Sequence, residues 1–142
     1  MNEPSRIHEG GCLCGAIRYR STADPNALVL CHCSTCRKAS GAPSLGWAIF
    51  PAETFAFTKG QPATYQSSDN VLRSFCPHCG TTIGYASSTR TDVADVTLAS
   101  LDEPERYAPQ KEIWLDEKLP WECVDPSRPR YPRSSMSSQP LP

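Results

Sequence analysis

The stretch Cys76-Pro77-His78-Cys79-Gly80 decides most about how this chain folds. Two thiolates at this spacing on one turn can bind the same metal ion, while the proline shapes the turn and the glycine lets backbone N–H groups face the sulfurs. The next residues, 81–85 (TTIGY), predict a strand rather than the helix that a redox Cys-x-x-Cys pair normally begins. The pattern indicates a zinc knuckle, with a redox pair or two buried unligated cysteines as the alternatives.

A second cysteine pair would complete this site. Cys12 and Cys14 stand among three glycines, which allow the positive φ angles of a tight turn around a metal. Two such pairs supply the four ligands of a closed tetrahedral zinc site. Because this site would clamp the N-terminal region to the middle of the chain, metal binding would contribute to folding. We expect a structural zinc on Cys12, Cys14, Cys76 and Cys79.

A third cysteine group is Cys31-His32-Cys33-Ser34-Thr35-Cys36, which has no matching partner pair. Three protein ligands and one open position are the pattern of a catalytic zinc. The alternative is a structural site completed by His32, His78 or Cys123. His32 is adjacent to a ligand and would turn onto the same metal only with difficulty, and Cys123 beside Trp121 can be a small buried hydrophobe. We therefore expect the three cysteines to form an open site.

The charge of the open site suggests its chemistry. Zinc with three thiolates carries about one net negative charge, so it is a weaker Lewis acid than a three-histidine zinc and suits another soft ligand. A small thiol entering the fourth position would lose its proton and become a thiolate nucleophile, which favours carbon–sulfur bond chemistry. Arg37 and Lys38 could offset the charge or hold a substrate carboxylate, although a solvated basic pair is the commoner explanation.

Length and composition fit one small domain. Residues 1–11 lack an apolar signal core, and no stretch approaches the roughly 18 apolar residues of a spanning helix, so we expect a cytoplasmic protein without a membrane partner. Thiols in that compartment are kept reduced, so the eight cysteines favour metal over the alternative of disulfides. Fourteen basic residues face 15 acidic ones, which makes a nucleic-acid partner unexpected.

Short apolar runs between proline and glycine turns predict a mainly β domain at residues 1–124, with the metal on its loops. No segment has a long helical period. The expected strands are residues 16–20, 27–31, 45–50, 54–57, 63–66, 71–75, 83–86, 93–98 and, as a late edge strand, 113–115. Residues 125–142 are rich in proline, arginine and serine, and we expect them to form a disordered tail without a function of its own.

Four motifs resemble those of the glutathione-dependent formaldehyde-activating enzyme family, which also contains centromere protein V. They are residues 11–19 (GCLCGAIRY), 31–38 (CHCSTCRK), 41–43 (GAP) and 75–81 (FCPHCGT). The resemblance extends from about Gly10 to Trp121 and includes Ile113 and Trp114. One position departs from it, because family members often carry a histidine where this chain has Glu112. Any role of that histidine cannot be transferred.

The resemblance implies a single compact domain of the Mss4-like zinc-binding β fold. It implies one structural zinc on residues 12, 14, 76 and 79, the pairing that the spacing also favours, and one catalytic zinc on residues 31, 33 and 36. The implied activity is that of a carbon–sulfur lyase that condenses glutathione with formaldehyde to S-hydroxymethylglutathione. Glutathione, or a related small thiol, is then the expected partner.

Two classes of function remain open. One is a zinc-dependent carbon–sulfur lyase acting on a thiol adduct, and the other is a non-catalytic zinc module that binds protein or nucleic acid, as the resemblance to centromere protein V suggests. We favour the enzyme, because the basic residues are balanced by acidic ones and part of them lies in the tail. Trp47, Trp114 and Trp121 are expected in the core or a pocket wall rather than as stacking platforms for bases.

Overall fold

The computed structural model describes residues 6–142, and over that range the chain is built mainly from β-strands, as expected. The strands are β1 (His8–Gly11), β2 (Arg18–Ser21), β3 (Ala27–Cys31), β4 (Leu45–Pro51), β5 (Phe55–Lys59), β6 (Ala63–Ser68), β7 (Val71–Phe75), β8 (Thr82–Ser87), β9 (Arg90–Thr97) and β10 (Lys111–Ile113). The helices are α1 (Ser34–Ser40) and four 3-10 turns, Ala52–Thr54, Leu98–Ser100, Pro104–Arg106 and Leu115–Glu117. None of the helices between residues 6 and 142 could span a membrane.

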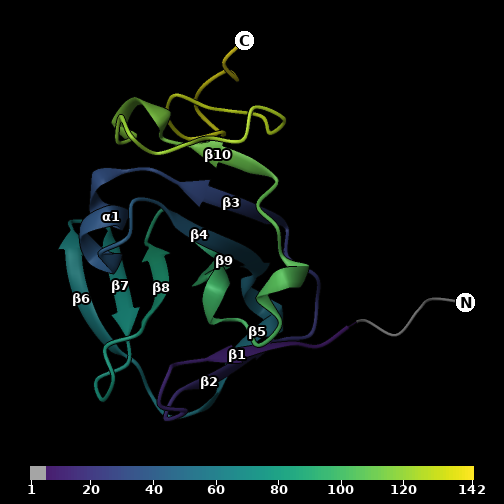
Figure 1. Cartoon of the computed structure of the whole chain (residues 1–142). Coiled ribbons are helices and arrows are strands. Elements are labelled where there is room, and N and C mark those ends of the chain that lie inside the picture. The colour runs from purple at the N-terminus through teal and green to yellow at the C-terminus, as the bar shows by residue number, and fades with distance from the viewer. Residues whose placement is uncertain (1–5) are drawn as a thin grey trace, which may run out of the picture.

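The strands form two sheets. The smaller has the order β1-β2-β5, and the larger has the order β10-β3-β4-β9-β8-β7-β6. All neighbouring strands are antiparallel except β10 and β3, which run parallel. Figure 1 shows β1 and β2 at one end of the molecule, with β10 and the C-terminal segment at the other. A shared core joins the two sheets, so the chain forms one compact domain.

One face of the larger sheet makes the main core. Leu28, Ala48 and Val96 are paired across β3, β4 and β9, and all three are buried. They pack with Ile17 and Tyr19, which come from the region of the smaller sheet. Burial of each large apolar side chain contributes about 1.5–3 kcal/mol, so this face stabilises the contact between the sheets.

The other face of the larger sheet carries a second, smaller cluster. Because side chains alternate along a strand, Val29 and Cys31 of β3 point away from the main core. Trp47 is paired with Val29 in the antiparallel register, and Ile113 with Cys31 in the parallel one. Cys36 of α1 packs into the same cluster. This face therefore brings the third cysteine group against an apolar surface.

Helix α1 was not predicted from the sequence. The Cys33 sulfur accepts the N–H of Cys36 at the start of the helix, and Gly41, with φ of 72°, closes its end by donating to the carbonyl of Arg37. The helix has seven residues, fewer than the repeat of apolar positions needs to show a helical pattern. Its ends are fixed by these caps rather than by an apolar stripe.

Residues 125–142 follow a defined course rather than the expected disordered one. β10 is an edge strand, and an edge leaves backbone groups that need partners. The Glu112 N–H donates to the Pro129 carbonyl, and the Tyr131 N–H donates back to the Glu112 carbonyl, both at 2.9 Å. Figure 1 shows this yellow segment lying over β10. The low aliphatic content of the segment gave no sign of this, because its contacts are made by backbone groups. The domain boundary at residue 124 stays a prediction.

Candidate metal centres and the adjoining cavity

Two knuckles bring Cys12, Cys14, Cys76 and Cys79 together, with all four sulfurs within 4.8 Å of one another. The Sγ–Sγ distance is 3.6 Å between Cys12 and Cys14 and 3.8 Å between Cys14 and Cys76. Sulfurs bound at about 2.3 Å to one tetrahedral zinc are about 3.8 Å apart, so the donor set fits that ion. The hydroxyl of Thr81 lies 3.1 Å from the sulfur of Cys79 and lowers the pKa of that thiol to about 5.

The two knuckles share their backbone geometry. In each, the N–H of the first cysteine donates to the carbonyl five residues later, at 3.1 and 3.0 Å. The N–H groups of Ile17 and His78 donate to the first sulfur of their knuckles at 3.2 and 3.4 Å. Gly15 and Gly80 have φ of 80° and 78°, which side chains other than hydrogen disfavour. Gly15 and Gly80 therefore turn the backbone toward the sulfurs, whereas Gly10 and Gly11, for which a positive φ was also expected, lie in β1 without one.

The third group consists of Cys31 at the end of β3, Cys33 before α1 and Cys36 within α1. Their sulfurs also lie within 4.8 Å of one another, and three soft thiolates suit zinc. Hydrogen bonds from Cys31 and Cys36 hold the pKa of Cys33 well below its ordinary value. Among the described residues no further histidine, cysteine or carboxylate joins this group.

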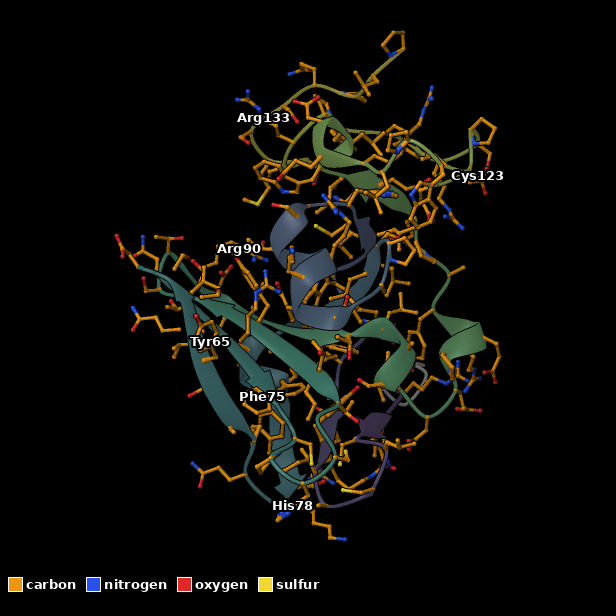
Figure 2. All side chains as sticks on the ribbon, turned by 60° about the vertical axis from the view of Figure 1, so that its left-hand side comes forward. Tyr65, Phe75, His78, Arg90, Cys123 and Arg133 are labelled. Carbon is orange, nitrogen blue, oxygen red and sulfur yellow. The ribbon has the colours of Figure 1, made fainter. Side chains whose placement is uncertain are left out.

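None of the three alternative fourth ligands reaches the third group. His32 is fully buried, and its Nε2 is 2.9 Å from Oε1 of Glu112. Cys123 is exposed, and His78 belongs to the second knuckle. Figure 2 shows His78 at the end of the molecule opposite Cys123 and Arg133. A fourth ligand at this group would therefore have to come from outside the described residues.

A cavity of about 540 Å³ adjoins the third group, and all three of its cysteines line it. The cavity lies over the second face of the larger sheet, where cross-strand pairing aligns Ile49, Asp95, Tyr85 and Arg73 in one row. Its apolar wall includes Val29, Trp47, Ile49, Ile113 and Trp114. Its polar wall includes Arg73, Arg90, Asp92, Asp95, Lys111 and Glu117. A volume in this range accommodates a small organic molecule. The prediction that tryptophans form core or pocket wall is confirmed for Trp47 and Trp114, whereas Trp121 is exposed.

Arg73 is the cation closest to the cysteines. It is 6% exposed, its guanidinium lies over the Tyr85 ring at 5.2 Å, and it donates to Thr35 Oγ1 at 3.1 Å. Two of its nitrogens are 3.7 and 3.8 Å from the sulfur of Cys36. Its Nε and the Nδ1 of His32 are the two buried side-chain nitrogen or oxygen atoms without a partner among residues 6–142. The signal in the sequence was an arginine in the middle of a predicted strand, a position at which a buried charge is unusual.

Arg37 and Lys38 do not provide this charge. Arg37 donates to the carbonyls of His32 and Glu117, at 3.4 and 3.3 Å, and so ties the cysteine loop to the 3-10 turn that follows β10. Lys38 is exposed. The Glu117 carboxylate accepts from the Ser34 hydroxyl at 2.8 Å and adds a second link between the same segments. Arg37 and Glu117 thus hold the loop, and neither Arg37 nor Lys38 lines the cavity.

Asp95 and Arg90 form an ion pair on the polar wall. Arg90 Nη1 is 3.1 Å from Asp95 Oδ2, and the Asp95 side chain is 8% exposed. Burial raises the pKa of Asp95, and the charge of Arg90 opposes that shift. Arg90 is thereby occupied by a carboxylate of the protein, whereas Arg73 forms no ion pair with a carboxylate among the described residues. Arg73 is thus a buried cation of this wall that can receive a foreign anion, and Lys111 on the same wall also forms no ion pair with a carboxylate among residues 6–142.

Comparison with known proteins places these features in a family. A protein of Halomonas elongata, provisionally named a glutathione-dependent formaldehyde-activating enzyme, is 27% identical over 124 residues, which is 80% of this chain and 78% of that protein. An uncharacterized lyase of Schizosaccharomyces pombe is 33% identical over 79 residues, which is 56% of this chain and 57% of that protein's length. The crystal structure of a Rhodobacter sphaeroides protein matches the fold with a TM-score of 0.53 at 22% identity, over 66% of this chain and 87% of that one.

The family model itself matches residues 7–117, a range that contains the four knuckle cysteines, the third cysteine group and β10. The high strand content and the single compact domain agree with the Mss4-like fold of that family. The chain belongs to the glutathione-dependent formaldehyde-activating enzyme family.

Proposed function

We propose that this protein is a zinc-dependent carbon–sulfur lyase that acts on an adduct of glutathione, or a related small thiol, with an aldehyde. The observation that carries the proposal is the cavity of about 540 Å³ lined by Cys31, Cys33 and Cys36. Three thiolates beside such a cavity leave room for a further ligand, in contrast to the four that converge at the knuckles. Membership of the family supports the same reaction class.

In this proposal the four knuckle cysteines and the three cysteines of the third group have different roles. Cys12, Cys14, Cys76 and Cys79 hold a structural zinc, and Cys31, Cys33 and Cys36 hold a catalytic one. Zinc held by Cys31, Cys33 and Cys36 would supply the chemistry that keeps a small thiol deprotonated at neutral pH. The chain's own residues then set where the thiol and the aldehyde lie relative to each other.

Arg73 has the central part among those residues. Its guanidinium offsets the negative charge of the three cysteines, and it can receive a carboxylate of the thiol substrate through a charge-assisted hydrogen bond. Its stacking on Tyr85 fixes the direction of the guanidinium. Trp47 and Trp114 close the cavity with apolar surface, which excludes water and strengthens the electrostatic contacts inside.

The proposed reaction is tested by magnetisation-exchange NMR on a mixture of formaldehyde and glutathione. The native protein should accelerate interconversion without changing the equilibrium, and Cys33→Ser should abolish that acceleration. A cobalt-substituted protein provides a second readout, because a thiol that reaches the metal changes its absorption. If another thiol perturbs the cobalt spectrum and glutathione does not, the substrate is wrong. If no thiol does so, the lyase proposal fails and the non-catalytic binding module replaces it.

A further inference from the structure

The cavity has an apolar wall that formaldehyde does not require. Val29, Trp47 and Ile49 lie on the same face of β3 and β4, and Ile113 continues this surface onto β10 beside Cys31. We call Val29, Trp47, Ile49, Ile113 and Trp114 the apolar strip. All five line the cavity next to the three cysteines. A one-carbon aldehyde could contact only a small part of this surface.

Trp114 is held in an unusual backbone conformation at this strip. Its φ is 60°, the one positive value for a residue other than glycine between residues 6 and 142. A bulky residue keeps such a conformation only where its surroundings enforce it, and these positions cluster at functional sites. The Trp114 N–H donates to the Arg133 carbonyl at 3.1 Å, and its carbonyl accepts the N–H of Glu117 at 3.1 Å. The C-terminal segment therefore helps to keep this indole on the cavity wall.

The same C-terminal segment contributes a wall of its own. Ser134, Ser135 and Met136 line the cavity, although they lie outside residues 7–117, which match the family model. In this chain the three cysteines lie in the part that matches the family, while one wall of their cavity, residues 134–136, lies outside it. A wall of this kind can determine which substrates fit.

We infer that the aldehyde carries an apolar group, aliphatic or aromatic, that packs on the apolar strip and is bounded by residues 134–136. This inference rests on the proposed function. Glutathione, with two carboxylates and an ammonium group, cannot cover an apolar surface without losing hydration, so the apolar group belongs to the aldehyde. In the reaction the thiol sulfur bonds to the carbonyl carbon, the carbonyl π bond breaks, and the proton lost from the thiol ends on the oxygen as a hydroxyl. Cleavage reverses these changes.

The experiment uses S-alkylglutathiones from methyl to hexyl, which are inert thioethers with the alkyl group at the aldehyde's position. Calorimetric titration of the full chain should show Kd falling about threefold to fourfold for each added methylene, until the chain meets residues 134–136. Ile49→Thr should reduce this dependence on length. The control Leu72→Ala, at an exposed position of β7 outside the cavity lining, should leave it unchanged. Removal of residues 134–142 should change the alkyl chain length that gives the lowest Kd. The truncated chain ends at Arg133, so the hydrogen bond from the Trp114 N–H to the Arg133 carbonyl is kept.

Absence of binding, an affinity independent of chain length, or identical dependence in the native protein and Ile49→Thr would overturn the inference. These ligands undergo no carbon–sulfur chemistry, so the result is separate from the fate of the proposed reaction. If the protein accelerates exchange with formaldehyde but its Kd does not depend on alkyl chain length, the apolar aldehyde is refuted and the proposed lyase activity is retained. A steep alkyl series without acceleration for any aldehyde refutes the lyase and leaves the apolar binding site intact.

Discussion

Nε2 of His32 and Oε1 of Glu112 are 2.9 Å apart, and both side chains are fully buried. The contact joins the cysteine loop, which follows β3, to β10. The strands β3 and β10 are far apart in sequence but are parallel neighbours in the sheet. The other carboxylate oxygen of Glu112 accepts the N–H of Asp125 at 3.1 Å. A single carboxylate therefore fixes both the loop that carries the three cysteines and the beginning of the C-terminal segment.

Loss of this carboxylate should destabilise the fold. Glu112→Ala leaves a buried donor on His32 and a half-buried donor on Asp125 without a partner, and we expect the free energy of unfolding to fall by about 3 kcal/mol. Glu112→Gln keeps an acceptor oxygen and should cost less. Urea unfolding measures both, with the exposed Glu105→Ala as the control. An alanine variant as stable as the control would show that the pair contributes nothing to folding.

Substitutions in the two cysteine groups should have different consequences. The knuckle cysteines join segments 62 residues apart, from Cys14 to Cys76, whereas the third group lies within one loop. Cys79→Ser should therefore unfold or aggregate the protein, while Cys33→Ser should remain folded and lose activity. Thermal unfolding and metal analysis of the two variants test this. Equal loss of thermal stability would contradict the division into structural and catalytic sites.

Chelation should separate the two metal ions. Metal analysis after mild purification should give about two zinc ions per chain, and a mild chelator should remove one of them first. The ion held by the three cysteines should leave, because the cavity gives the chelator access to it. Circular dichroism should show that the β fold survives this step. Simultaneous loss of both ions together with unfolding would count against an open position at Cys31, Cys33 and Cys36.

Arg73 should tune the open site without supporting the fold as a whole. Arg73→Gln removes the charge next to Cys36, and we expect a loss of about 10- to 100-fold in activity and in zinc affinity of that site. Arg73→Lys should restore part of the zinc affinity but not the fork-shaped contact with a substrate carboxylate. Arg20→Gln, at an exposed position of β2, is the matched control. Wild-type affinity for zinc and substrate in Arg73→Gln would exclude this role.

Two aspartates should affect stability with opposite pH dependence. The hydrogen bonds from Arg18 lower the pKa of Asp102, whereas burial raises the pKa of Asp95. Stability from Asp102 is present above its unfolded pKa of about 4 and is lost as the pH falls through its folded pKa. Stability from Asp95 is present below its unfolded pKa and is lost as the pH rises through its folded pKa.

Asp102→Asn should therefore lower the free energy of unfolding near pH 7 and leave it almost unchanged at low pH. Asp95→Asn should gain stability relative to the native protein as the pH rises from about 3 to 7. Urea unfolding of both variants at several pH values gives the comparison. Parallel pH profiles for the two substitutions would show that the local environments of the carboxylates do not control their contributions.

The sequence predicted the features that depend on local spacing. Alternation and turn residues placed most strands, and the spacing of Cys76 and Cys79 predicted two thiols close together on one turn, because such a pair is a local property. The pairing of β10 with β3 and the contacts of Glu112 depend on residues about 80 positions apart. Arg73 could not be assigned to the cysteines for the same reason, since nothing in its own strand shows which face meets α1.

The parallel pairing of β10 with β3 also has a consequence for the order in which the protein is made. Cys31, Cys33 and Cys36 leave the ribosome within a few residues of one another, but β10 and the C-terminal segment that cover their loop follow about 75 residues and more later. At a synthesis rate of about 5–20 residues per second, this interval lasts several seconds. During that time three adjacent thiols are free to bind metal or to be oxidised before the wall of their cavity exists.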